Sequence, residues 1–184
     1  MTNRGPPGLG SDANAASSLV CAEGALRQTN GVQWGSVNAE RTSDGATDAA
    51  TSGVHGVLEG LRVVVVDDDG DARDLLATVL LQRSAKVFVA ECAAEAFELV
   101  KRELPHALIS DIAMPEEDGY MLIARVRALP EHGGGKTTSI AVTAYAGRAD
   151  RKRALDAGFD AHFAKPVDID SLVEELTVLR PKAG

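Results

Sequence analysis

From Leu58 onward, short apolar runs alternate with amphipathic segments, and this alternation constrains the fold more than any other feature. The runs are Leu61 to Val66, Lys86 to Ala90, Ala107 to Ile109 leading into Asp111, Ser139 to Thr143 and Asp160 to Ala164. The segments with helical periodicity are Asp71 to Gln82, Ala93 to Glu103, Tyr120 to Ala128, Arg148 to Ala157 and Asp168 to about Leu179. Five strand–helix repeats with short connections predict a mostly parallel sheet that is covered by helices on both faces.

The first apolar run indicates how this sheet is buried. It contains four consecutive valines, Val63 to Val66, and such β-branched enrichment is typical of a strand that is covered on both faces. Because crossover connections between parallel strands are right-handed, only a few topologies remain. We therefore expect an α/β fold, a flavodoxin-like, doubly wound (βα)5 sheet with the strand order 2-1-3-4-5.

Residues 1–57 differ from the rest of the chain in composition. They are rich in Gly, Ser, Ala, Asn and Thr, Trp34 is their only aromatic residue, and no apolar periodicity persists in them. Such a segment buries too little apolar surface to offset the entropy of ordering. We predict a disordered N-terminal extension over residues 1–57 and one domain over residues 58–184. A partner-binding segment that folds on contact, anchored by Trp34, is the alternative.

Charge and composition exclude several function classes. The formal net charge of −8 argues against a nucleic-acid surface, which needs clustered Lys and Arg. The longest apolar run is about five residues, whereas a membrane span needs roughly 20, and the start of the chain has no signal pattern. Cys21 and Cys92 show neither metal nor redox spacing. We expect a cytoplasmic protein with no membrane or nucleic-acid partner.

Polar residues stand at the ends of four of the predicted strands. Asp67 and Asp68 follow the first strand, Asp111 ends the third, Thr143 ends the fourth and Lys165 follows the fifth. The carboxyl ends of parallel strands meet at one edge, where α/β proteins place their chemistry. Three carboxylates there would repel one another unless a cation such as Mg²⁺ joined them. With a hydroxyl and an ammonium nearby, this set predicts transfer of a phosphoryl group to a carboxylate.

Taken in order, these motifs resemble those of a known family. Asp67-Asp68, Asp111 with Met114-Pro115 and Asp118-Gly119, Thr143-Ala144 and Lys165-Pro166 resemble the signatures of the chemotaxis-regulator-like receiver domain of response regulators in two-component signalling. The resemblance extends from about Leu58 to Lys182. It implies that Asp111 accepts a phosphoryl group from a phosphohistidine on a histidine kinase or a histidine phosphotransfer protein. A protein target downstream is then implied as well.

The resemblance also implies roles for the other motif residues. Asp67, Asp68, Asp111 and the backbone carbonyl of Ala113 would hold Mg²⁺, for which Mn²⁺ would substitute. Thr143 would be the switch hydroxyl and Lys165 would bind the phosphoryl oxygens, with a Lys165–Pro166 peptide that is usually cis in this family. Such a protein catalyses its own phosphorylation and autodephosphorylation without being a turnover enzyme.

Position 162 departs from the family pattern, which often has an aromatic switch residue there. His162 would either rotate inward when Thr143 moves, adding pH sensitivity near neutrality, or lie exposed at the sheet edge. The run from Gly158 to Asp168 resembles receivers that are attached to hybrid histidine kinases, which favours a relay or phosphate-sink role. Because the chain ends about five residues after the last predicted helix, no DNA-binding or enzymatic output domain is expected.

Other functions remain as alternatives. A receiver-like module that acts without phosphorylation is one, although it would not need all five site residues. A haloacid-dehalogenase-like phosphatase, with Asp67 as nucleophile, would leave Asp111 and Lys165-Pro166 unexplained. A flavodoxin-type flavin carrier would have Ser, Thr and Gly after the first strand instead of Asp.

Two local features of the helices complete the expectations. Asp71 is expected to cap the helix after the first strand, and Asp168 is expected to cap the last helix. The fourth predicted helix has a basic face, which is either a solvated surface or part of the output surface. That face consists of Arg148, Arg151, Lys152 and Arg153.

Overall fold

The computed structural model describes residues 56–145 and 147–178. Its strands are β1 (Arg62–Val66), β2 (Lys86–Ala90), β3 (Ala107–Asp111), β4 (Thr138–Thr143) and β5 (Ala161–Ala164). Its helices are α1 (Gly70–Gln82), α2 (Ala93–Glu103), α3 (Gly119–Arg127), α4 (Arg148–Ala157) and α5 (Ile169–Val178), with one 3-10 turn, η1 (Glu131–Gly133). Where both ends are described, each predicted element differs from the observed one by at most one residue.

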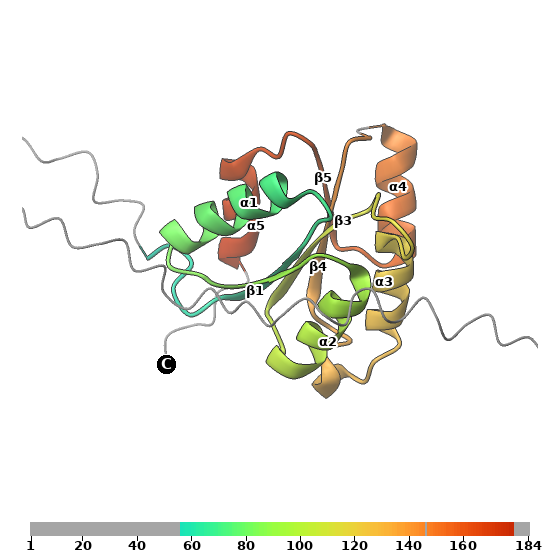
Figure 1. The fold of residues 1–184 in the computed structure, drawn as a ribbon, viewed down its shortest axis with the longest axis horizontal. Coiled ribbons are helices and arrows are strands. Elements are labelled where there is room, and N and C mark those ends of the chain that lie inside the picture. The colour runs from blue at the N-terminus through green and yellow to red at the C-terminus, as the bar shows by residue number, and fades with distance from the viewer. Residues whose placement is uncertain (1–55, 146, 179–184) are drawn as a thin grey trace, which may run out of the picture.

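The strands form one parallel sheet in the order β2-β1-β3-β4-β5, which confirms the predicted fold. Helices α1 and α5 cover one face of the sheet, and α2, α3 and α4 cover the other (Figure 1). Strand β3 lies at the centre with β1 and β4 as its neighbours. This order brings the carboxyl ends of β1, β3, β4 and β5 together at one edge.

The valines of β1 divide between two apolar cores. Val63 and Val65 pack with α1 and α5, while Val64 and Val66 pack with α2, α3 and α4, because successive side chains of a strand point to opposite faces. None of the four is more than 1% exposed. Burying one such side chain contributes roughly 1.5–3 kcal/mol, so β1 is firmly held and offers the residues after it a rigid support.

The cap of α1 differs from the prediction. Asp69, with an extended backbone, accepts hydrogen bonds from the amides of Asp71 and Ala72. The prediction that Asp71 caps α1 was therefore wrong, because the helix begins one residue earlier and Asp71 lies in its first turn. Asp168 directly precedes α5 as predicted, and the Ser171 hydroxyl donates to its carboxylate at 2.5 Å, which lowers the pKa of Asp168.

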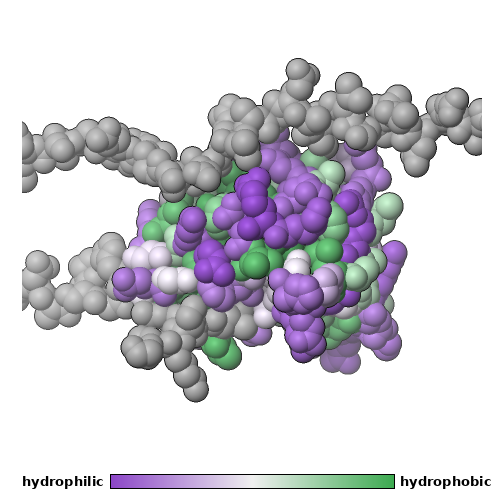
Figure 2. All heavy atoms as spheres, turned by 90° about the horizontal axis from the view of Figure 1, so that it is seen from below, coloured by the Kyte–Doolittle hydropathy of each residue, from purple (hydrophilic) through white to green (hydrophobic). Residues whose placement is uncertain are grey.

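The predicted extension over residues 1–57 lies outside the described residues except for Gly56 and Val57, so Trp34 and Cys21 are outside them as well. Leu58 is fully buried against the α1/α5 core, and its amide donates to the carbonyl of Arg83. Hydrophilic side chains dominate the face seen in Figure 2, with smaller hydrophobic areas among them. Within residues 56–145 and 147–178, no helix has the length and apolar character that a membrane crossing requires.

Candidate functional site

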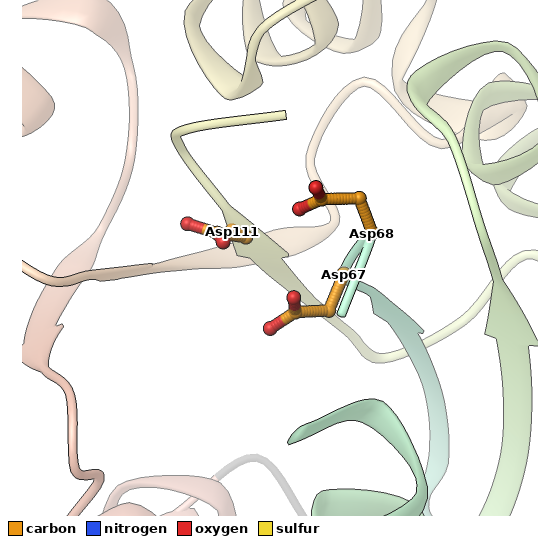
Figure 3. Close-up of side chains that lie close together, drawn as sticks. All are labelled: Asp67, Asp68 and Asp111. Atoms are coloured by element: carbon orange, nitrogen blue, oxygen red, sulfur yellow. The ribbon is translucent and has the colours of Figure 1, made fainter. Parts of the chain in front are cut away.

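Three carboxylates meet at the carboxyl edge of the sheet. Asp67 and Asp68 follow β1, and Asp111 is the last residue of β3. Because Val66 pairs with Ser110 in the parallel register, Asp67 and Asp111 come next to each other on neighbouring strands. The three carboxylates extend to the same side, and each offers an oxygen that lies within 4.8 Å of the others (Figure 3). The structure thus brings together the three acidic residues predicted from the sequence.

Lys165 joins two of these carboxylates. Its Nζ lies 2.7 Å from Asp111 Oδ2 and 2.8 Å from Asp67 Oδ2. The lysine follows β5, and its amide donates to the carbonyl of Thr143 at 2.7 Å, so its side chain crosses β4 to reach β3 and β1. The Lys165–Pro166 peptide is cis, as the resemblance implied.

Backbone amides hold the remaining oxygens of the two buried carboxylates. The amide of Ala113 donates to Asp111 Oδ1 at 3.1 Å, and the amide of Asp69 donates to Asp67 Oδ1 at 3.0 Å. Asp67 is 1% exposed and Asp111 6%, whereas Asp68 is exposed. In the part of the chain that the structure describes, no hydrogen bond or ion pair holds the Asp68 carboxylate.

Burial and neighbouring charges shift the pKa values of Asp67 and Lys165. Burial raises the pKa of Asp67, and the charge of Asp111 raises it further, although hydrogen bonds from Lys165 and Asp69 partly oppose this. Burial alone would lower the pKa of Lys165, but hydrogen bonds to Asp111 and Asp67, and the charges of both, raise it above its usual value. The lysine therefore stays charged, while the buried Asp67 carboxylate is not fully compensated.

The donor set fits a divalent cation. In formal charges, three carboxylates and one ammonium leave two negative charges without a counter-charge. Carboxylate oxygens are the ligands that Mg²⁺ takes in proteins, usually one or two of them, together with waters and phosphate oxygens. The raised pKa of Asp67 is consistent with a site that still needs positive charge.

Thr143 and His162 lie on the face that α4 covers. Thr143 is 2% exposed, and its hydroxyl accepts a hydrogen bond from the amide of Tyr145 at 3.1 Å. His162 pairs in register with Ala141, two residues before Thr143, so that Thr143 and His162 share one face of the sheet. The Nε2 atom of His162 is buried and has no hydrogen-bond partner among the described residues. His162 as a whole is half-buried, so the alternative in which it lies exposed at the sheet edge is not confirmed.

The basic face of α4 is exposed, as both readings of it required. Lys152 pairs with Asp156 one turn away, at 2.5 Å. The Arg153 guanidinium lies 4.3 Å from the centre of the Tyr120 ring on α3, a cation–π contact. Arg153 thus contacts a neighbouring helix, while the ion pair of Lys152 lies within its own helix.

One residue near the site was missed by the sequence analysis. Arg73, in the first turn of α1, donates to the carbonyl of Asp67 at 2.8 Å and to Glu91 after β2 at 3.1 Å. The only sequence feature that links Arg73 to the site is its spacing of six residues from Asp67. That spacing does not reveal in which direction the long arginine side chain points.

Comparison with known proteins matches residues 63–177 to the family model of the response regulator receiver domain. A 14.6 kDa protein in the sodA1 3′ region of Leptolyngbya boryana is 51% identical over 111 residues, which are 60% of this chain and 83% of that protein. Response regulator MprA of Mycobacterium leprae is 31% identical over 65% of this chain and 50% of its own. Sensor histidine kinase RcsC of Escherichia coli is 31% identical over 76% of this chain and only 14% of its own.

Solved structures agree with this match. The receiver domain of the Francisella response regulator 1452 superposes with a TM-score of 0.60 at 25% identity, over 65% of this chain and 96% of that one. The receiver domain of sensor histidine kinase PA1611 from Pseudomonas aeruginosa, which has a magnesium ion coordinated in its active-site cleft, gives 0.59 at 26% identity, over 65% and 97%. With the fold, the acidic edge and the family model in agreement, the chain belongs to the response regulator receiver domain family of two-component systems.

Proposed function

We propose that Asp111 accepts a phosphoryl group from a phosphohistidine on a histidine kinase or a histidine phosphotransfer protein. The observation that supports this best is the setting of the Asp111 carboxylate at the end of the central strand. Lys165 contacts one of its oxygens, the Ala113 amide contacts the other, and Asp67 and Asp68 lie beside it. The proposal makes this chain a phosphorelay component that modifies itself without turning over a substrate.

In the transfer, an Asp111 oxygen forms a bond to phosphorus while the bond from phosphorus to the histidine nitrogen breaks. The leaving imidazole takes up a proton at that nitrogen. Lys165 then directs its ammonium to a phosphoryl oxygen instead of the free carboxylate, and the Thr143 hydroxyl donates to another. Mg²⁺, held by Asp67, Asp68, Asp111 and the Ala113 carbonyl, would neutralise the negative charge on both sides, and Mn²⁺ would substitute.

Signalling follows from the change at Thr143. To reach a phosphoryl group on Asp111, the Thr143 hydroxyl gives up its bond from the Tyr145 amide. His162 shares its face of the sheet, and within residues 56–145 and 147–178 its Nε2 has no partner, so its inward rotation breaks no hydrogen bond there. Movement of these residues would shift the equilibrium between two conformations of the surface formed by α4, β5 and α5. A downstream protein would dock on that surface in one of the two conformations.

The relatives bear on the place of this domain in a relay. Two kinds of protein, the response regulator MprA and the sensor histidine kinase RcsC, contain a region that is similar to this chain. We propose a cytoplasmic relay or phosphate-sink role, because the run from Gly158 to Asp168 resembles receivers of hybrid kinases. Hydrolysis of the acyl phosphate on Asp111 would end the signal.

The proposal is tested by intact-protein mass spectrometry after incubation with acetyl phosphate and Mg²⁺. We expect wild type to gain one phosphoryl group, EDTA to prevent the gain, and Asp111→Asn to gain none. Asp156→Asn is the matched control, because it makes the same change at a residue that is 64% exposed on α4 and lies outside the acidic cluster. If folded wild type gains nothing from acetyl phosphate or from a panel of phosphorylated histidine kinases, the phosphorylation-independent module replaces this proposal.

A further inference from the structure

We infer that Arg73 is a positioning residue for the metal ligand Asp68, acting through the backbone that joins Asp67 to Asp68. This inference rests on the proposed function, because it concerns how firmly the chain holds the Mg²⁺ of that site. It depends on three observations: what holds the carboxylates, what holds the peptide between them, and how Arg73 itself is held.

Asp68 differs from the other two carboxylates because no group among the described residues orients its side chain. Asp67 and Asp111 each have one oxygen on Lys165 and the other on a backbone amide. Asp68 is exposed, and no hydrogen bond within residues 56–145 and 147–178 reaches its carboxylate. The backbone of Asp68 therefore sets only where its side chain begins, and this is the part that neighbouring residues can hold.

Arg73 holds that backbone. Its Nη1 donates at 2.8 Å to the carbonyl of Asp67, which belongs to the peptide group that leads into Asp68. The ladder between β1 and β2 is weakening at this point, since the amide of Asp67 lies 3.4 Å from the carbonyl of Ala90. That long bond restrains the peptide before Asp67, whereas the hydrogen bond from Arg73 restrains the next peptide, between Asp67 and Asp68.

The guanidinium is itself fixed from a second side. Its Nη2 donates to Glu91 Oε1 at 3.1 Å, and the Arg73 side chain is only 12% exposed. The Arg73 amide also donates to the carbonyl of Asp69, so that the side chain starts from the first turn of α1. One planar group with several donors spans the ends of β1 and β2, which a lysine ammonium on a flexible stem cannot reproduce.

Groups that orient metal ligands typically change metal affinity by about 10- to 100-fold when they are removed. For Arg73→Met, which keeps the apolar stem and removes the donors, we expect about a tenfold weaker Mg²⁺ affinity, at the lower end of that range, because only one of three carboxylates loses its orientation. The measurement is isothermal titration of the full chain with MgCl₂ at low ionic strength. Urea unfolding in EDTA establishes that each variant is folded.

Three further variants make the test specific. Arg73→Lys keeps the charge and should also lose several-fold in affinity; this second variant serves if Arg73→Met does not fold. Glu91→Gln is the control, because a glutamine oxygen still accepts the hydrogen bond from Arg73 and only the charge of this 69% exposed partner is lost, so Mg²⁺ affinity should change little. In an Asp68→Asn background, Arg73→Met should have a much smaller effect, since the carboxylate that it positions has been removed.

A kinetic measurement separates positioning from general damage. Phosphorylation by acetyl phosphate at saturating MgCl₂ should proceed in Arg73→Met at close to the wild-type rate, while the half-saturating Mg²⁺ concentration rises about tenfold. A purely structural role would lower the saturated rate and leave the half-saturation unchanged, and would overturn the inference.

Two other outcomes would overturn it. One is an unchanged Mg²⁺ affinity in Arg73→Met, and the other is full wild-type affinity in Arg73→Lys, which would show that the planar guanidinium is not needed. Absence of any Mg²⁺ binding by wild type would refute the metal site itself. That failure is recognised in wild type alone, before any Arg73 variant is compared.

Discussion

Replacing Lys165 by methionine should destabilise the metal-free protein by about 3 kcal/mol at pH 7. Among the described residues, Lys165 is the only cation that forms an ion pair with the carboxylates of Asp67 and Asp111. At an effective dielectric constant of about 20, charges 2.7 Å apart attract by roughly 6 kcal/mol before desolvation is counted. Breaking a buried pair costs about 3–5 kcal/mol, and we take the lower end because the Lys165 side chain is 25% exposed.

The loss of stability in Lys165→Met should become smaller as the pH falls. Lys165 lowers the pKa of Asp67, which burial already raises, so its removal raises the folded-state pKa of Asp67 still further above the unfolded value. Ionised Asp67 then destabilises the folded protein at pH 7, and protonation relieves this as the pH falls through the raised pKa. The difference between Lys165→Met and wild type should therefore shrink toward pH 4.

The assay is urea unfolding in EDTA at pH 7 and near pH 4, followed by circular dichroism. Lys152→Met is the matched control: its partner Asp156 is 64% exposed, so it should change the free energy of unfolding by less than about 0.5 kcal/mol. Adding Mg²⁺ at 100 times its Kd should return up to about 2.7 kcal/mol. Equal stability of Lys165→Met and wild type at pH 7 without metal would refute this reasoning.

Three more predictions concern single positions. Ser84 is exposed and has a φ of 68°, a left-handed backbone conformation that glycine adopts more easily, so Ser84→Gly should raise the free energy of unfolding by about 1 kcal/mol and Ser84→Ala should not. Thermal melting measures both variants, and equal melting temperatures would contradict the prediction. A Cβ on Gly119 would lie 2.5 Å from the carbonyl oxygen of Asp111, so Gly119→Ala should lose about 1–3 kcal/mol on urea unfolding, and wild-type stability would show that the loop yields. Because the pKa of Asp67 is raised, Mg²⁺ affinity should decline with falling pH before an ordinary aspartate would protonate; a titration series from pH 8 to pH 4 measures this, and a flat profile across that range would disprove it.

Much of the candidate site was predictable because it depends on local patterns. The valine run of β1 and the apolar run before Asp111 each define a buried strand from a few neighbouring residues. Once the strands are parallel, their carboxyl ends must meet, so Asp67, Asp111 and Lys165 reach one edge whatever the details of packing.

Several contacts depend on side-chain direction and could not be predicted. Asp69 rather than Asp71 caps α1, because the choice depends on the exact residue at which the helix begins. The Nε2 atom of His162 is buried without a partner among the described residues, and sequence spacing does not reveal the burial of a single side-chain atom.

The amino-acid sequence by itself determined the alternation of strands and helices, the parallel sheet and the set of residues at its edge, since these follow from periodicity and from the end of each strand. Only the tertiary structure decided how those residues divide their contacts. It placed Lys165 on two carboxylates, left Asp68 without a partner among the described residues, and turned Arg73 back onto the Asp67 carbonyl. The physical reason is that long side chains choose among several rotamers of similar energy, and the choice is made by neighbours distant in sequence.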